Sequence, residues 1–251
     1  MSGHSKWAGI KHKKAVVDAK RGQAFTRASR EITIAAKEGG GDVDGNFRLR
    51  LAVQKAREAN MPADKIQAAI DRGTGAGKGE SLEELRYEGY GPAGVAIMVD
   101  CMTDNRNRTA PAIRHAFSKY GGSLGETNSV GWMFERKGVL TVQTGDHDPE
   151  EVGLAAIEAG ADDIQVDRGT LEVTTEPATF EDVRKALEAA GVTIENAELT
   201  MQPKQTVPVG EDKAAAVLRL LEALEEEDDV QHVYANFDIP EDVLERVSAS
   251  V

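Results

Sequence analysis

The sequence predicts an α+β protein: an N-terminal three-helix domain followed by two ferredoxin-like α/β domains, one inserted into the other. Apolar residues recur at helical spacing through the first part of the chain, and short apolar runs typical of strands begin near residue 87. The middle of the chain carries strands and helices in a complete βαββαβ order. The expected domains are residues 1–79, residues 80–136 joined to 204–251, and residues 137–203.

Three helices account for the first domain. The first has an apolar stripe with Arg27 and Arg30 away from its centre, and GGGD at 39–42 ends it. This stripe consists of Ala24, Phe25, Ala28, Ile32, Ala35 and Ala36. The second helix is expected over residues 46–59, and the third begins at Pro62, because a first helical residue needs no N–H. Their apolar faces consist of Leu49, Ala52, Val53 and Ala56, and of Ile66, Ala69 and Ile70.

The split domain is expected to contain two βαβ units. In the first, GVAIMVDC and SVGWMFE form strands on either side of a helix over residues 109–120. In the second, KQTVPV and DVQHVYANF are the strands and DKAAAVLRLLEALEE is the helix. Between these units lie VLTVQT, helix 149–159, DDIQVD, TLEVTT, helix 179–190 and TIENAELT. Because this series is a complete ferredoxin-like unit, we expect it to be an insertion.

The composition is that of an ordinary soluble protein, with 40% hydrophobic and 29% charged residues. No apolar run approaches the roughly 18–20 residues that a membrane span needs. The polar N-terminus lacks the apolar stretch of a secretory signal. The single cysteine, Cys101, lies in the apolar run VAIMVDC and has no second cysteine to pair with. We therefore expect a cytoplasmic protein that does not act at a membrane.

The sequence patterns that resemble cofactor-binding or catalytic motifs lack the spacing or the structural context that those motifs require. Gly89, Gly91 and Gly94 have the G-x-G-x-x-G spacing, but they precede a strand and do not open a helix, which indicates a turn. The GK pair at 77–78 lacks the other residues of a P-loop. The five histidines show no metal-binding spacing, and no nucleophile lies at a recognisable spacing from a base. We therefore expect no enzymatic activity, cofactor, metal or small-molecule substrate.

Charge is distributed unevenly along the chain, whose net charge is −13. Residues 1–78 contain 16 Lys and Arg against eight Asp and Glu, a net charge of +8, whereas residues 79–251 contain 14 against 35, a net charge of −21. Nucleic acids bind clustered Lys and Arg and release counterions when they do so. The asymmetry therefore indicates a polyanion-binding segment on an acidic remainder. Within that remainder, the run EALEEEDD at 222–229 is expected to be a solvated face or a charged edge that repels other nucleic acid.

The densest basic stretch is the N-terminal segment SGHSKWAGIKHKKAVVDAKRG, which we expect to be a partly mobile arm that binds backbone phosphates. Trp7 either stacks on an exposed base or packs the arm onto the helical domain. The candidate nucleic-acid-binding residues of the whole chain are Lys6, Trp7, Lys11, His12, Lys13, Lys14, Lys20, Arg21, Arg27, Arg30, Arg106 and Arg108.

The last two candidates belong to TDNRNRT, a polar segment between a predicted strand and a predicted helix. Asn107 or Thr109 is expected to cap the helix and Pro111 to lie in its first turn, which leaves exposed N–H groups as an anion site flanked by Arg106 and Arg108. The alternative is a polar capping loop whose arginines pair with the acidic surface. Two further basic residues of the helix favour the phosphate contact: Arg114 and Lys119.

Five motifs in the same order resemble the YebC family over the whole chain. They are SGHSKWAGIKHKKAVVDAKRG, NMPADKIQAAIDRGTG, YEGYGPAGVAI, TDNRNRT and GGSLG. The resemblance implies a three-domain α and β protein of bacteria and mitochondria that acts as a DNA-binding transcriptional regulator. It also implies a second role, because other members resemble translation factors: the mitochondrial form activates synthesis of a cytochrome oxidase subunit, and bacterial relatives act at ribosomes stalled on proline runs.

These observations lead us to expect a DNA-binding transcriptional regulator. The alternative is a ribosome-associated translation factor, a translational activator or a factor that relieves stalling, which binds structured ribosomal RNA. Phosphate contacts position a protein on either polymer without reading its sequence, so they do not separate the two. No helix stands out as a recognition helix rich in base-reading side chains, which favours the alternative. A third class, a protein-interaction scaffold, predicts no nucleic-acid binding at all.

Overall fold

The computed structural model describes residues 18–76, 82–145, 147–167 and 169–248. These residues form two compact units. One unit is Met133–Gln205, and the other combines the described residues up to Trp132 with those from Thr206 onward. The division into three domains stays a prediction.

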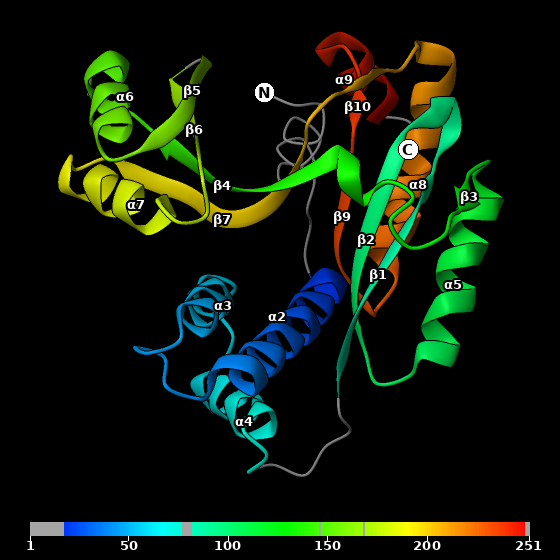
Figure 1. Cartoon of the computed structure of the whole chain (residues 1–251), viewed down its shortest axis with the longest axis horizontal. Coiled ribbons are helices and arrows are strands. Elements are labelled where there is room, and N and C mark those ends of the chain that lie inside the picture. The colour runs from blue at the N-terminus through cyan, green and yellow to red at the C-terminus, as the bar shows by residue number, and fades with distance from the viewer. Residues whose placement is uncertain (1–17, 77–81, 146, 168, 249–251) are drawn as a thin grey trace. The chain divides into compact units, whose positions relative to one another are not determined.

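The described part of the larger unit begins with three helices: α2 (Asp18–Gly39), α3 (Phe47–Glu58) and α4 (Ala63–Gly73) (Figure 1). The predicted apolar faces form their common core, with Ala24, which is exposed, as the exception. Asn46 fixes the start of α3, because its side chain accepts a hydrogen bond from Leu49 N–H and donates to Ala35 O at 2.7 Å. Pro62 was predicted as the first residue of the third helix but is its N-cap, and its carbonyl accepts from the N–H of Ile66.

A four-stranded sheet of order β3-β1-β2-β9 follows in the same unit, with every neighbouring pair antiparallel. Its strands are β1 (Glu83–Tyr90), β2 (Ala96–Thr103), β3 (Ser123–Leu124) and β9 (Val230–Ala235). The helices α5 (Arg106–Lys119) and α8 (Glu211–Glu226) pack on this sheet, and their core includes Val99, Phe117 and Leu218. The unit is completed by the 3-10 helices η1 (Pro92–Gly94) and η2 (Gly131–Met133), the short parallel pair β8 (Val207–Pro208) and β10 (Phe237–Asp238), and α9 (Glu241–Ser248).

The two predicted βαβ units of this sheet are wrong as units, although the strands GVAIMVDC and DVQHVYANF and both of their helices are confirmed. Residues 83–90 form strand β1, which was not predicted from the sequence. The glycine-rich turn joins β1 to β2, and Gly89 lies inside β1. The first five residues of SVGWMFE form a bend and η2, and only its last two residues lie in a strand. KQTVPV contributes only the two residues of β8, which pair with β10. The hairpin β1-β2 therefore lies at the centre of the sheet, and the strand order differs from that of a ferredoxin-like domain.

The unit Met133–Gln205 has the predicted βαββαβ order. Its elements are β4 (Phe134–Gln143), α6 (Pro149–Glu158), β5 (Ala161–Asp167), β6 (Thr170–Thr175), α7 (Phe180–Ala189) and β7 (Thr193–Pro203). The antiparallel sheet has the order β5-β6-β4-β7, so the ferredoxin-like arrangement is confirmed here, as is the α+β class of the whole chain.

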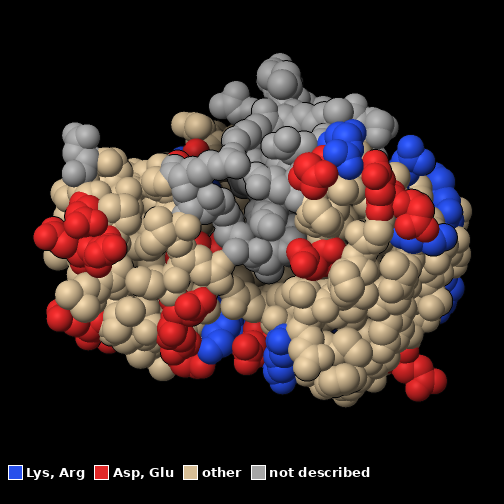
Figure 2. Space-filling view, turned by 90° about the horizontal axis from the view of Figure 1, so that it is seen from above, with Lys and Arg blue, Asp and Glu red and all other residues tan. Residues whose placement is uncertain are grey.

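Close packing and acidic side chains characterise this smaller unit. A Cβ atom at Gly138 of β4 would lie 2.3 Å from Cδ2 of the buried Phe180, so only glycine leaves room for α7 on the sheet. Residues 133–205 contain 16 Asp and Glu against six Lys and Arg. Figure 2 shows acidic side chains over the surface of this unit, at the left of the view.

Candidate nucleic-acid interface

Helix α2 carries four of the candidate residues: Lys20, Arg21, Arg27 and Arg30. Lys20 and Arg21 lie near the N-terminal end of α2, but their side chains are outside the described part of the chain. The same holds for every atom of the candidates in the arm, namely Lys6, Trp7, Lys11, His12, Lys13 and Lys14. Because Ile32, Ala35 and Ala36 face the helical core, Arg27 and Arg30 are directed to other partners.

The first set of partners is the C-terminal end of α8. Gln23 donates a hydrogen bond from Nε2 to Glu226 O at 2.9 Å, and Arg27 donates from Nη2 to Glu225 O. The last carbonyls of a helix have no partner inside the helix and carry partial negative charge, so these contacts satisfy them. Burial lowers the pKa of Arg27 below its ordinary value, although the charge of Asp228 opposes that shift. Arg27 and Gln23 thus act as C-terminal caps of α8.

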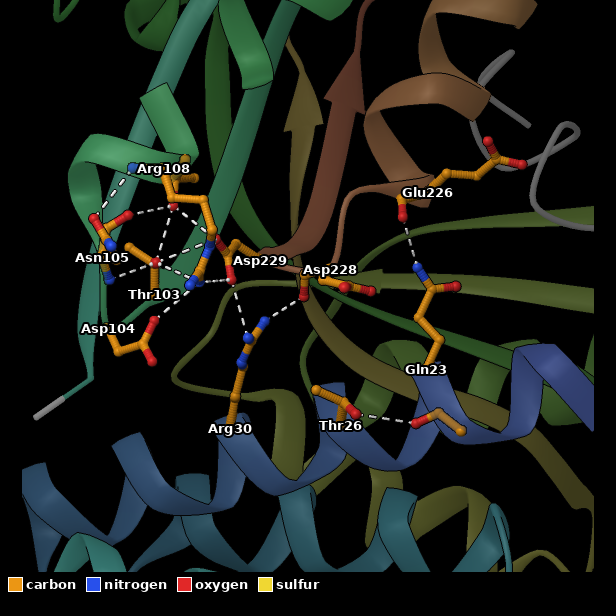
Figure 3. Close-up of polar contacts among 12 residues, drawn as sticks. Gln23, Thr26, Arg30, Thr103, Asp104, Asn105, Arg108, Glu226, Asp228 and Asp229 are labelled. Carbon is orange, nitrogen blue, oxygen red and sulfur yellow. Dashed lines mark hydrogen bonds and ion pairs between the residues drawn. The ribbon is translucent and has the colours of Figure 1, made fainter. Parts of the chain in front are cut away.

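The second partner is Asp229, a residue just after α8 that is 6% exposed and whose carboxylate receives two guanidinium groups (Figure 3). Arg30 Nη2 lies 2.9 Å from Oδ1, and Arg108 Nη2 lies 2.8 Å from the same oxygen. The hydroxyls of Thr109 and Thr103 donate to Oδ2 at 2.7 and 3.2 Å. Arg30 also donates to the backbone carbonyl of Asp228. The carboxylate therefore joins α2, the end of β2 and the start of α5.

These contacts set the ionisation of Asp229. Burial pushes its pKa upward, but hydrogen bonds from Thr109 and Arg108, together with the charges of Arg30 and Arg108, outweigh burial and leave the pKa below its ordinary value. Asp229 therefore carries a negative charge at neutral pH. The expectation of a solvated face is wrong for this residue of the acidic run, because a buried charge needs such partners.

The start of α5 differs in detail from the prediction. Asn105 is the N-cap, and its side chain accepts from Arg108 N–H at 3.2 Å, so neither Asn107 nor Thr109 caps the helix. Pro111 lies inside the helix, beyond its first turn. The cause is a local hydrogen bond: the Thr103 hydroxyl accepts from Asn105 N–H at 2.9 Å, which fixes the backbone two residues after β2, so the helix starts at Arg106.

The two arginines of this segment have different surroundings. Arg108 forms ion pairs with Asp229 and with Asp104, the latter at 2.9 Å. This agrees with the alternative prediction of a capping loop whose arginines pair with acidic residues. The Arg106 side chain is 68% exposed, and its Nε lies 3.7 Å from a carboxylate oxygen of Glu83. Arg114 and Lys119 are also exposed on α5. The solvent-facing positive charge of this segment therefore begins at Arg106 and continues along the helix.

Comparison with known proteins places these features in a family. Residues 5–76 match the family model described as "TACO1/YebC protein N-terminal domain", and residues 82–237 match the model "TACO1/YebC second and third domain". The chain belongs to the TACO1/YebC family. The resemblance found in its motifs is thereby confirmed.

Individual relatives of this TACO1/YebC protein span nearly its whole length. A protein of Natranaerobius thermophilus named "Probable transcriptional regulatory protein" is 56% identical over 98% of this chain and 99% of its own. A Rubrobacter xylanophilus protein with the same name is 56% identical over 99% of this chain and 100% of its own. The crystal structure of a conserved hypothetical protein from Aquifex aeolicus is 46% identical, has a TM-score of 0.81 and covers 90% of this chain and 93% of its own.

The sequence of this TACO1/YebC protein did not predict the oxygen atoms that accept hydrogen bonds from the candidate residues. Asp229 and the carbonyls of Glu225 and Asp228 bind the predicted arginines, yet no local pattern separates Asp229 from its acidic neighbours. Thr103 was predicted only as part of a polar segment and Thr109 as a possible helix cap, whereas both hydroxyls donate to the buried carboxylate of Asp229.

The described residues contain neither a cluster of metal ligands nor a membrane-spanning helix. No group of three or more His, Cys, Asp or Glu side chains in that part of the chain is arranged to hold a metal ion. None of the helices described has both the length and the apolar character needed to cross a bilayer.

Proposed function

We propose that this protein is a non-enzymatic, nucleic-acid-binding regulator of gene expression that acts on DNA in the cytoplasm. The observation that carries the proposal is the partition of charge, +8 over residues 1–78 and −21 over the remainder. Such a partition favours a phosphate polymer at one end of the chain and repels it elsewhere. The names of the relatives from Natranaerobius thermophilus and Rubrobacter xylanophilus support a regulatory role.

The contacts of the arginines indicate which basic residues are available to phosphate. Arg27 and Arg30 are bound by the end of α8 and by Asp229, so phosphate would have to displace these partners. We therefore assign the main phosphate contacts to the basic residues that precede Arg27 in the sequence. Arg106, which is 68% exposed, supplies a further contact from α5.

Fluorescence anisotropy tests this proposal with the full chain, a duplex DNA and a hairpin RNA of equal length. The affinity for DNA should fall steeply between about 50 and 200 mM salt, because each phosphate contact releases counterions. Changing Lys11, Lys13 and Lys14 to Ala should lower the slope of log K against log salt by about 0.9 for each contact that is lost.

A matched control removes the same charge elsewhere. Changing Lys185, Lys204 and Lys213 to Ala in the acidic remainder should leave affinity and salt slope unchanged. Equal losses from the two triple variants, or no binding of either polymer at low salt, would refute the proposal. Clear preference for the hairpin RNA would reassign the protein to the alternative, a ribosome-associated translation factor.

A further inference from the structure

Exposed apolar side chains gather on one side of the unit Met133–Gln205. Across the described chain, four large hydrophobic side chains are strongly exposed, and three of them lie on α6 and β5. These three are Leu154, Ile157 and Val166, with exposed fractions of 58%, 49% and 56%. Single exposed apolar residues are ordinary, but a group of them marks a surface that another molecule covers.

The three side chains follow the border between α6 and β5. Gly153 of α6 lies against Ile164 of β5, because a Cβ atom at Gly153 would be 2.6 Å from Ile164 Cδ1. Ile157 is one helical turn after Gly153 and lies on the same side of α6. Leu154 is three residues before Ile157 and therefore adjacent to it on the helix surface. Val166 is two residues after Ile164 and so points to the same face of the sheet. We call Leu154, Ile157, Ile164 and Val166 the α6/β5 edge.

Strand β5 lies at one edge of the sheet that the described residues form. It is the terminal strand of the order β5-β6-β4-β7 and pairs with β6 through residues Ala161–Asp167. A terminal strand presents a row of N–H and C=O groups on its outer side, which a further strand can pair with. The α6/β5 edge therefore combines apolar side chains with a terminal strand of the described sheet.

The acidic residues around the α6/β5 edge indicate which kind of molecule can bind there. Residues 148–167, which contain α6 and β5, include seven Asp and Glu and no Lys or Arg. Glu150, Glu151 and Glu158 are exposed on α6, and Asp163 is exposed on β5. Two copies of this edge would bring like charges together, which opposes self-association through it. A partner with Lys or Arg beside its apolar residues would meet opposite charges.

We propose that the α6/β5 edge binds a protein segment that extends the sheet as an additional strand beside β5 and carries alternating apolar and basic residues. The apolar side chains cover Leu154, Ile157 and Val166 on the face of the sheet that α6 covers, and the basic side chains alternate to the opposite face, where Asp163 of β5 lies. The carboxylates of α6 add a longer-range attraction for the basic segment. This function goes beyond nucleic-acid binding, since it uses a different unit of the chain and the opposite charge.

The test uses the ¹⁵N-labelled full chain and, as probe, an N-acetylated heptapeptide of alternating lysine and valine. Titration should shift backbone amide signals of β5 and α6, and alternate amides of β5 should exchange more slowly with deuterated water in the complex. Changing both Leu154 and Ile157 to Ser should weaken binding about tenfold or more, because it removes much of the apolar surface covered. Trp132→Ser, which removes the remaining strongly exposed apolar side chain, is the matched control and should leave affinity unchanged.

Any of the following three results would overturn the proposal. No signal shift at millimolar peptide, or shifts confined to β7, would show that the edge does not accept a strand. Equal binding of a glutamate–valine heptapeptide would remove the role of charge. A concentration-dependent dimer in analytical ultracentrifugation that Leu154→Ser with Ile157→Ser abolishes would assign the edge to a second copy of the chain.

Discussion

Nη2 of Arg30 lies 2.9 Å from Oδ1 of Asp229, and both side chains are largely withdrawn from solvent, with 17% and 7% of their surface exposed. The pair joins α2 to the segment between α8 and β9. Because Asp229 also binds Arg108, one carboxylate neutralises two of the candidate nucleic-acid-binding arginines. This acidic residue of the chain therefore has a structural role inside the larger unit.

Asp229→Asn should destabilise the protein by about 2–4 kcal/mol, because it leaves the charges of Arg30 and Arg108 without their common partner. Urea unfolding followed by circular dichroism measures the change. Asp228→Asn is the control, since Asp228 is exposed and binds Arg30 through its backbone carbonyl, so its loss should be within about 0.5 kcal/mol. Equal losses in the two variants would contradict a specific role of the Asp229 carboxylate.

The stabilisation by Asp229 should also depend on pH. Its folded-state pKa lies below its ordinary value, so the stabilisation is fully present above the unfolded pKa of about 3.9 and is lost as pH falls through the lower, folded value. The difference in free energy of unfolding between the wild type and Asp229→Asn should be constant above about pH 5 and shrink below about pH 4. A series of urea titrations checks this, and a difference that widens in acid would refute it.

Glu227 should behave in the opposite way. Burial raises its pKa, and the neighbouring carboxylates of Asp228 and Asp229 raise it further. A raised folded-state pKa means that the ionised form costs stability at neutral pH, and that this cost disappears as pH falls through the folded pKa. Glu227→Gln should therefore raise the Tm by about 1–2 °C at pH 7 and leave it unchanged near pH 4. Scanning calorimetry at both pH values, with Glu226→Gln as control, measures the effect.

Elements with a strong local pattern were predictable from the sequence. The three helices have apolar residues at helical spacing and are separated by GGGD and by Pro62, so their positions follow from neighbouring residues alone. The unit Met133–Gln205 was predictable for the same reason, because apolar residues recur along each of its strands and helices at the spacing typical of that element. Strand β1 was missed because EELRYEGY mixes charges with apolar residues and one charged residue, Glu88, is buried.

The partners of the candidate arginines could not be predicted, because they depend on residues that are distant in the sequence. Arg30 and Asp229 meet only once α2 packs beside the end of α8, and no spacing in either segment signals that contact. The same limit applies to Arg108, whose pairing or exposure depends on where Asp229 lies. The arm was predicted from composition alone, and its residues lie outside the part that the structure describes.

Cys101 should be unreactive in the folded protein. It is buried in β2, and burial raises the pKa of its thiol to about 12, so almost no thiolate forms near neutral pH. Iodoacetamide at pH 8 should leave the folded chain unmodified and alkylate one thiol per chain in urea, as mass spectrometry would show. Rapid alkylation without urea would mean that β2 opens locally or that the thiol is accessible.

Glu88 should prove essential for the fold of residues 125–131. The residue is 3% exposed, and its carboxylate accepts hydrogen bonds from the backbone N–H groups of Asn128, Val130 and Gly131 at 3.0, 2.8 and 2.6 Å. Glu88→Gln replaces one acceptor oxygen by a donor that faces these N–H groups, so it should cost about 2 kcal/mol and speed amide exchange at Val130 and Gly131. Glu84→Gln on the same strand, an exposed position, is the control. Unchanged exchange at both amides in Glu88→Gln would show that other contacts hold this segment.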